Sequence, residues 1–141
     1  MLIRQDVLCE IIQKMPTNPP EAGGIIGGNR GSISVWEFDE GYKECGCVYR
    51  PNVNYLNDVI SKWSDNDIEF LGIFHSHFGG ARTLSLGDVE YITRIMKSMP
   101  THINLLYFPI VVQPNSELVP YMATIDAENN VEIKEDELEI I

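Results

Sequence analysis

The chain has 141 residues, 44% of them hydrophobic, and a formal net charge of −11. This length is typical of one domain, and this hydrophobic content is enough for one core. The negative charge argues against nucleic acid or an anionic membrane as a partner. No N-terminal stretch has the pattern of a signal peptide, and no apolar run approaches the ~18 residues of a membrane span. We therefore expect a cytoplasmic protein with a single domain over residues 1–141.

Periodic apolar residues, with glycine and proline breaks between them, divide the first part of the chain into elements. In order, they predict a helix at Gln5–Met15, strands near Gly23–Gly28, Ser32–Asp39 and Cys45–Arg50, and a helix at about Val53–Ser64. This order favours a mixed α/β fold in which helices flank one β-sheet.

The next segment, Ile68–Phe74, is an apolar run of the length expected for a buried strand, and His75, Ser76 and His77 follow it directly. Alternate side chains of a strand point to the same face, so the two imidazoles project together while Ser76 points away. One rigid element thus supplies two potential metal ligands.

An acidic residue follows at the start of the next predicted helix. Residues 78–84 contain two glycines and no periodicity, which predicts a loop that turns the chain back towards the histidines. From Leu86 to Met99 apolar residues recur at steps of three and four, which predicts an amphipathic helix with Asp88 in its first turn. The end of the strand and the start of the helix are therefore expected to face each other.

Two imidazoles and one carboxylate match the composition of catalytic zinc sites, which keep a fourth position open for water. We therefore predict one zinc ion per chain, held by His75, His77 and Asp88. Zinc lowers the pKa of bound water to about 7, and a nearby carboxylate is needed to shuttle the proton. Glu21 is the candidate, because it opens a run, residues 21–28, whose glycines let another backbone approach closely.

Each of these residues also has a simpler interpretation. Ser85 followed by Asp88 is the pattern of a capping box, in which the serine caps a helix and the acid bonds back to the first free N–H. A pair of histidines two residues apart also occurs at solvated strand ends, and Glu21 alone is an ordinary surface acid. It is the combination of positions that indicates a metal site.

After the helix, the runs Ile103–Val112 and Leu118–Ile125 predict central strands, and Val131–Lys134 predicts a short edge strand. His102, at the helix exit, is expected to be structural. Acidic residues are concentrated near the end of the chain, where we expect an edge strand and then a frayed tail at about 131–141. Alternatively, this acidic surface steers a basic partner.

The three cysteines, Cys9, Cys45 and Cys47, are an odd number in a chain large enough to fold without disulfide bonds, which predicts reduced thiols. Cys45 and Cys47 could share a strand face. No further ligands of suitable spacing accompany them, so we predict no second metal site.

The combination of Glu21, His75-Ser76-His77, Ser85 and Asp88 resembles the full motif of the JAMM/MPN+ metalloproteases of JAB/Mov34 type. That motif is a glutamate in an early strand, then His-Ser/Thr-His, seven residues, serine, two residues and aspartate. The similarity runs from about Glu21 through the helix after Asp88, and the chain looks like a stand-alone prokaryotic member.

The resemblance implies an MPN-like fold, which is a curved mixed β-sheet flanked by helices. It also implies roles for the residues of the motif: the histidines and Asp88 hold zinc, and Glu21 acts as general base and then as general acid. Ser85 would help to stabilise the tetrahedral oxyanion.

Two positions depart from the family's pattern. Members commonly have one proline directly after the second histidine and another before the serine, whereas this chain has Phe78 and Leu84. We therefore expect the intervening loop to follow a different path, which affects contacts with substrate more than metal binding.

The function implied by the resemblance is a zinc-dependent peptidase or isopeptidase. Its substrate would be the amide after the Gly-Gly tail of a ubiquitin-like or sulfur-carrier protein, because an extended tail can add to a sheet edge and only small residues pass a narrow channel. The alternatives are an MPN module that serves as a scaffold without catalysis, and a hydrolase of small non-protein amides. An intact Glu21 argues against a scaffold, which needs no general base.

Overall fold

The structure, a computed structural model, describes residues 1–42 and 48–141. In these residues it contains the helices α1 (Gln5–Lys14), α2 (Val53–Asp65) and α3 (Leu86–Ser98). The strands are β1 (Leu2–Ile3), β2 (Gly23–Asn29), β3 (Ser32–Asp39), β4 (Glu69–His77), β5 (Leu105–Tyr107), β6 (Ile110–Val112), β7 (Glu117–Val119), β8 (Tyr121–Ile125), β9 (Val131–Glu135) and β10 (Glu139–Ile140).

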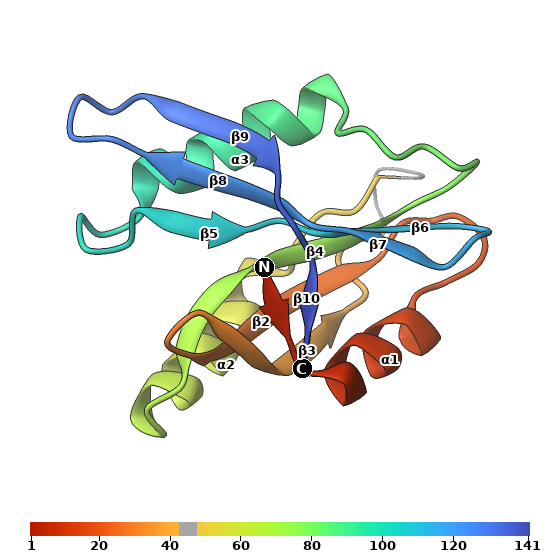
Figure 1. Cartoon of the computed structure of the whole chain (residues 1–141), viewed down its shortest axis with the longest axis horizontal. Helices are drawn as coiled ribbons and strands as arrows, with labels where there is room; N and C mark the ends of the chain where they lie inside the picture. The colour runs from red at the N-terminus through yellow and green to blue at the C-terminus, as the bar shows by residue number, and fades with distance from the viewer. Residues whose placement is uncertain (43–47) are drawn as a thin grey trace.

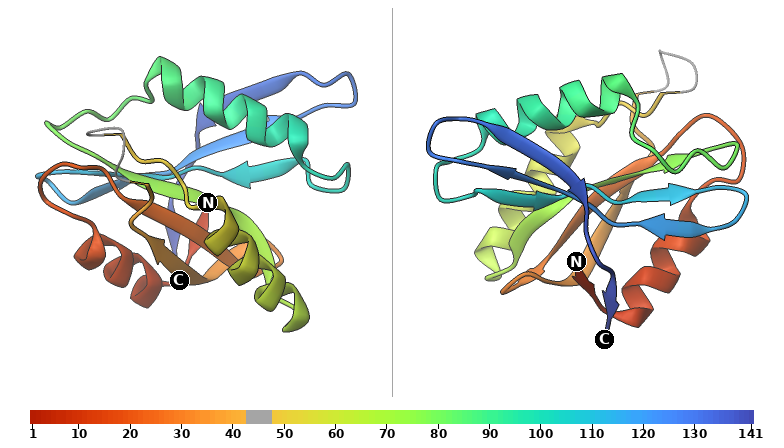
Figure 2. Two further views of the ribbon diagram at one scale, coloured as in Figure 1. Left: turned by 180° about the vertical axis from the view of Figure 1, so that it is seen from behind. Right: turned by 45° about the horizontal axis from the view of Figure 1, so that its top comes forward.

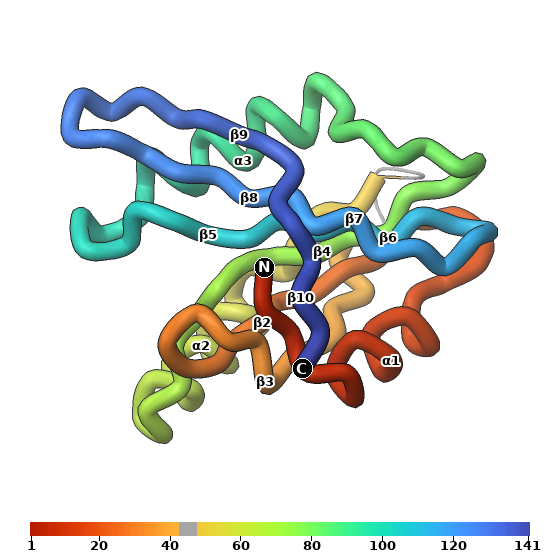
Figure 3. Tube along the Cα trace, in the orientation of Figure 1, coloured from red at the N-terminus to blue at the C-terminus, as the bar shows by residue number. Residues whose placement is uncertain are grey.

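Strand β4 lies at the centre of one mixed sheet. The strand order is β10-β1-β3-β2-β4-β5-β8-β9, and β6 and β7 branch from β4. β4 runs antiparallel to β2 and parallel to β5 and β6. Figure 1 shows how the sheet curls around β4, with β2 and β3 on one side and the arm of β5, β8 and β9 on the other, and Figure 3 traces the same path. The predicted mixed α/β fold is confirmed.

The side chains of β4 alternate between two buried clusters. Phe74, fully buried, belongs to the cluster that includes the apolar residues of α1. Ile73 belongs to the cluster that includes residues of α2 and α3. Figure 2 shows α3 lying along the arm of β8 and β9, which it contacts. Burial of a side chain such as Phe74 contributes about 1.5–3 kcal/mol, so β4 is anchored on one face while its other face carries the histidines.

The two long strands predicted after α3 are each divided in two. Pro109 separates β5 from β6, and Pro120 separates β7 from β8. Proline has no N–H to donate to a strand ladder, and the chain changes partner at each break. Both β5 and β6 pair with β4, but on the other edge β5 pairs with β8 whereas β6 pairs with β7. The earlier elements lie where the sequence predicted them, apart from the strand expected at Cys45–Arg50.

The prediction of a frayed tail is wrong, because the end of the chain forms β10 beside β1. The N–H of Glu139 donates to the Met1 carbonyl at 2.9 Å, and that of Ile141 donates to the Ile3 carbonyl at 2.9 Å. Figure 1 shows the two ends of the chain side by side. A strand of two residues is too short for sequence periodicity to reveal. The edge strand predicted near Val131 is confirmed as β9, the last strand of the order.

The strand expected at Cys45–Arg50 falls partly outside the described residues, as do Cys45 and Cys47 themselves. Val48–Arg50 are described and are not in a strand. Cys9 is an exposed free cysteine on α1, and His102 is exposed in the turn after α3. Over the two described ranges, the structure has no helix with the length and apolar character needed to span a membrane.

Candidate metal centre

The two histidines of β4 project from the same face of the strand, as the alternation of side chains predicted. Their Nε2 atoms lie 2.9 Å apart, and the side chains are only 13% and 8% exposed for His75 and His77 respectively. His75 is paired with Gly23 of β2 on one edge and with Ile110 of β6 on the other. Both imidazoles are therefore carried by backbone that the sheet holds in place.

Ser76, between the histidines, points to the other face and is fully buried. Its hydroxyl accepts a hydrogen bond from the N–H of Ala22 at 3.0 Å, and its own N–H donates to the Ala22 carbonyl at 2.9 Å. These bonds fix the residue next to Glu21 against β4. Sequence reasoning missed this role, although a hydroxyl expected on the face of the strand opposite the histidines was a signal, since a buried hydroxyl needs a partner.

Asp88 reaches the histidines from the first turn of α3. One carboxylate oxygen lies 3.1 Å from Nε2 of His77 and the other lies 3.3 Å from Nε2 of His75. The capping box is also present: Ser85 Oγ accepts from the Asp88 N–H at 3.0 Å, and the Asp88 carboxylate accepts from the Ser85 N–H at 2.9 Å. The two interpretations of this motif are thus compatible, because the box holds the carboxylate where it faces the histidines.

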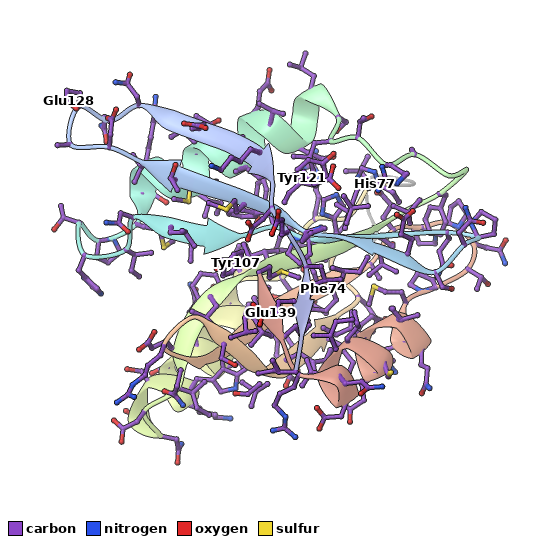
Figure 4. All side chains as sticks on the ribbon, viewed as in Figure 1. Phe74, His77, Tyr107, Tyr121, Glu128 and Glu139 are labelled. Carbon is purple, nitrogen blue, oxygen red and sulfur yellow. The ribbon has the colours of Figure 1, made fainter. Side chains whose placement is uncertain are left out.

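Hydrogen bonding fixes the orientation of His77. Its Nδ1 lies 3.1 Å from the carbonyl oxygen of Ala81, and because a carbonyl only accepts, Nδ1 carries the hydrogen. In the neutral ring Nε2 then keeps a free lone pair, which is the arrangement that second-shell carbonyls impose on metal-binding histidines. Figure 4 shows His77 and Phe74 on opposite sides of β4.

Charges in the centre shift the pKa values of Asp88 and His77 in opposite directions. Partial burial raises the pKa of Asp88, but hydrogen bonds from His75 and His77 outweigh it and hold this pKa well below its usual range. Partial burial likewise lowers the pKa of His77, but the hydrogen bond to Asp88 and the nearby negative charge raise it overall. The centre therefore favours an ionised acid beside a positive charge.

The spacing of these atoms fits a tetrahedral metal ion. Zinc binds imidazole nitrogen at about 2.0–2.1 Å, so neighbouring ligand atoms of a tetrahedral site lie about 3.3 Å apart. Each histidine nitrogen has one Asp88 oxygen near this separation, Oδ2 at 3.1 Å from His77 Nε2 and Oδ1 at 3.3 Å from His75 Nε2. The two nitrogens are slightly closer, at 2.9 Å. Nitrogen and carboxylate donors of this kind suit zinc.

Glu21 lies beside the same group. One ligand atom from each of Glu21, His75 and His77 lies within 4.8 Å of the others. The centre thus offers two carboxylates, with Asp88 in contact with both rings and Glu21 next to them. Burial raises the pKa of Glu21 and Asp88 adds to this, while the two histidines lower it, and the net pKa is raised. A carboxyl group of raised pKa is suited to both accept and return a proton.

A cleft of about 920 Å³ opens onto the centre. It is lined by the five residues predicted to hold the metal or to act in catalysis, which are Glu21, His75, His77, Ser85 and Asp88. Phe78 and Leu84, the two positions where the family's prolines are replaced, also line it, and the cleft continues to Tyr49 and Arg94. The replaced positions therefore face the space in which a substrate would lie. His102 does not line this cleft.

Comparison with known proteins assigns the chain to a family. Residues 5–124 match the family described as prokaryotic homologs of the JAB domain. This match covers most of the chain, and the chain belongs to that family, which includes zinc metalloproteases. The resemblance inferred from the motif is confirmed. No curated protein matched the sequence.

Solved structures support the fold. A protein of Desulfitobacterium hafniense, known from its solution structure, matches with a TM-score of 0.70 and 17% identity over 99% of this chain and 92% of its own. The crystal structure of a JAB1/MPN domain protein from Archaeoglobus fulgidus matches with a TM-score of 0.53 and 19% identity over 100% of this chain and 99% of its own. Identities this low show the fold alone, and they confirm the expected curved mixed sheet of the JAB1/MPN type.

Proposed function

We propose that the protein is a zinc-dependent peptidase or isopeptidase that hydrolyses the amide after the Gly-Gly tail of a ubiquitin-like or sulfur-carrier protein. The observation that carries this proposal is the convergence of His75, His77 and Asp88, with Glu21 beside them at the edge of a large cleft. The cytoplasm is the compartment we predict for the reaction.

In this proposal His75, His77 and Asp88 hold one zinc ion. When bound, zinc lowers the pKa of a coordinated water to about 7 and polarises the carbonyl to be attacked. Glu21 accepts the proton released by the attacking water and returns it to the leaving amine. The raised pKa of Glu21 supports this assignment, because a base poised nearer to neutral pH both takes and gives a proton.

In this proposal Ser85 both caps the helix and donates a hydrogen bond to the reacting carbonyl. Its oxygen accepts the hydrogen bond from the Asp88 N–H, and this uses a lone pair and leaves the hydroxyl hydrogen available. Ser85 is exposed and lines the cleft. We assign that hydrogen to the oxyanion that develops on the substrate carbonyl, where one such donor is worth about 10²–10³-fold in rate.

The Gly-Gly specificity rests on the family resemblance and on the walls of the cleft. Phe78, Leu84 and Tyr91 are among the bulky residues that line it around the metal ligands. Side chains of this size favour a substrate segment without side chains of its own at the reacting amide. An extended tail of this kind is recognised through its backbone, with pockets for flanking residues.

A panel of adducts tests the substrate class. Zinc-loaded protein is incubated with ubiquitin-like and sulfur-carrier proteins that carry an amino acid or a lysine-linked peptide after the Gly-Gly tail, and products are identified by mass spectrometry. We expect a product that ends in Gly-Gly, and no cleavage of matched adducts with an Ala-Ala tail. Cleavage of small amides alone would favour the small-molecule hydrolase, and cleavage of nothing by zinc-loaded protein would favour the scaffold.

The Glu21→Gln variant tests whether Glu21 is the general base while Asp88 is the carboxylate that holds the metal. We expect turnover to fall about 10²–10⁴-fold, the usual contribution of a positioned general base, while the zinc content stays at that of the wild type. Glu69→Gln, at the exposed start of β4, is the matched control and should change neither quantity. Loss of zinc from Glu21→Gln would instead make Glu21 a ligand.

A further inference from the structure

The aromatic ring of Tyr49 stacks on the imidazole of His75. The ring centroids are 6.5 Å apart and the planes differ by only 15°, which is within the range of offset-stacked aromatic pairs. His77 is oriented by the hydrogen bond from its Nδ1 to Ala81. The described residues provide no corresponding hydrogen bond for Nδ1 of His75. The two histidines are thus held by different means, and the flat face of Tyr49 takes the place of the missing bond.

The strand beneath Tyr49 leaves room for this ring. Gly23 of β2 pairs directly with His75 of β4, so the ring of Tyr49 lies over the pair. A Cβ atom on Gly23 would lie 2.6 Å from the Tyr49 ring, closer than carbon atoms approach. The glycine that gives β2 its close approach to β4 therefore also admits the tyrosine. This explains in part why a glycine lies opposite the first histidine.

The hydroxyl end of Tyr49 is fixed by Asp39, a buried residue at the end of β3. One oxygen of its carboxylate accepts from the Tyr49 hydroxyl at 2.9 Å and from the Asn52 N–H at 2.8 Å, and the other accepts from the Gly41 N–H at 2.9 Å. A buried carboxylate requires such partners. Asp39 thereby binds both the start and the end of the segment that carries Tyr49.

Tyr49 also lies near the other side of the reaction centre, because it lines the same cleft as Glu21. One residue therefore stacks on a predicted metal ligand and shares the cleft wall with the predicted general base. Asp39, which holds it, is the last residue of β3 and pairs with Gly23 of β2.

We propose that Tyr49, held by Asp39, is a positioning residue that sets the plane of the His75 imidazole. This inference rests on the proposed function, because it requires His75 to be a metal ligand. Tyr49 acts through His75 and not on the substrate. Its loss should loosen the metal geometry even when the fold is intact, as removal of second-shell partners does at metal sites.

The test measures the metal site directly and needs no substrate. Zinc affinity is determined by competition with a chromophoric chelator, and the geometry is read from the visible spectrum of the cobalt(II)-substituted protein. Tyr49→Met removes the ring and keeps much of the volume, whereas Tyr49→Phe keeps the ring and removes the bond to Asp39. Tyr42→Phe is the control, because it removes a hydroxyl that bonds Asn52 of the same segment, is 45% exposed and has no contact with the centre.

For Tyr49→Met we expect zinc affinity to fall about 10–100-fold, in line with other second-shell losses, with a changed cobalt spectrum. Tyr49→Phe should show a smaller loss in the same direction, and Tyr42→Phe should match the wild type. Circular dichroism and thermal melting establish that each variant is folded. Wild-type affinity and spectrum in folded Tyr49→Met would overturn the proposal, and if that variant does not fold, wild-type values in Tyr49→Phe would do so.

These outcomes separate the inference from the function on which it rests. Wild-type protein that binds no zinc would overturn both. Wild-type protein that binds zinc and cleaves Gly-Gly adducts, together with unchanged Tyr49 variants, would remove only the role of Tyr49.

Discussion

The two sides of the metal centre are built by different means. On the strand side, His75 and His77 belong to β4, whose backbone is paired with β2 and β6 at His75 and with β6 at His77. On the helix side, Asp88 is held by the reciprocal bonds of one capping box with Ser85. The strand side is nearly closed, with histidine side chains 13% and 8% exposed, whereas Leu86 at the start of the helix is 75% exposed.

This difference determines what a single substitution can do. The strand is held by many backbone hydrogen bonds, so the removal of one imidazole takes away a ligand and leaves the scaffold in place. The helix start is held by few bonds, so the removal of one hydroxyl alters both the local structure and the position of the carboxylate. The strand side should therefore show effects on the metal alone, and the helix side should show mixed effects that a second variant can separate.

The largest expected effect is on the strand side. In His77→Ala we expect the zinc content after a fixed chelator wash to fall from about one ion per chain to near zero, because a catalytic site keeps only three protein ligands. Zinc is measured by atomic emission, and circular dichroism should show the fold retained. His102→Ala, which changes an exposed histidine in the turn after α3, is the control and should keep its zinc. Equal, negligible zinc in the wild type and both variants would argue against the centre.

The next effect distinguishes the two tasks of Ser85 on the helix side. Ser85→Ala should lower the free energy of unfolding by about 1 kcal/mol, the usual cost of losing an N-cap, and should lower turnover about 10²–10³-fold through the oxyanion. Ser85→Asp restores a cap, since aspartate is as good an N-cap as serine, but its ionised side chain has no hydrogen to donate.

Chemical denaturation and cleavage of a Gly-Gly adduct measure the two quantities for these Ser85 variants. We expect Ser85→Asp to recover the stability and not the turnover. Recovery of both would show that Ser85 serves only the cap, and the helix side would then act on the reaction through Asp88 alone.

The parts of the centre that sequence could predict are those that follow from local periodicity. The two-residue period of a strand places His75 and His77 on one face, and the spacing of the apolar residues after Leu86 places Asp88 in the first turn of a helix. The capping box follows from the same spacing. Each of these inferences uses residues within a short stretch of chain, where backbone geometry alone decides which side chains meet.

The parts that sequence could not predict depend on contacts between distant segments. Ala22 meets Ser76 across 54 positions, and Tyr49 reaches His75 because Asp39 holds it there. Neither contact leaves a periodic signal. The prediction of a strand over Cys45–Arg50 failed at its described end for this reason, because the side chain of Tyr49 bonds to Asp39 and the backbone does not enter the sheet.

The smallest and most specific effect is on the pH dependence of stability. It comes from the contact between His77 and Asp88, which joins the two sides. Partial burial lowers the pKa of His77, but its bond to Asp88 outweighs this and raises it. In metal-free protein the charged pair therefore contributes stability that is fully present below the usual histidine pKa of about 6.5 and is lost as pH rises through the raised pKa of His77. Zinc reverses this dependence, because it binds only the neutral imidazole.

Thermal melting over a range of about pH 6–9, chosen to span a histidine titration, tests this reversal. Relative to His77→Gln, the melting temperature of chelator-treated wild-type protein should fall as pH rises, because the pair with Asp88 loses its positive partner. That of zinc-loaded wild-type protein should rise over the same range, because protons no longer compete for the ligand. If the melting temperatures of chelator-treated wild type and of His77→Gln depend on pH in the same way, this pair does not join the strand side and the helix side in solution. Asp88 would then have to reach the metal independently of His77.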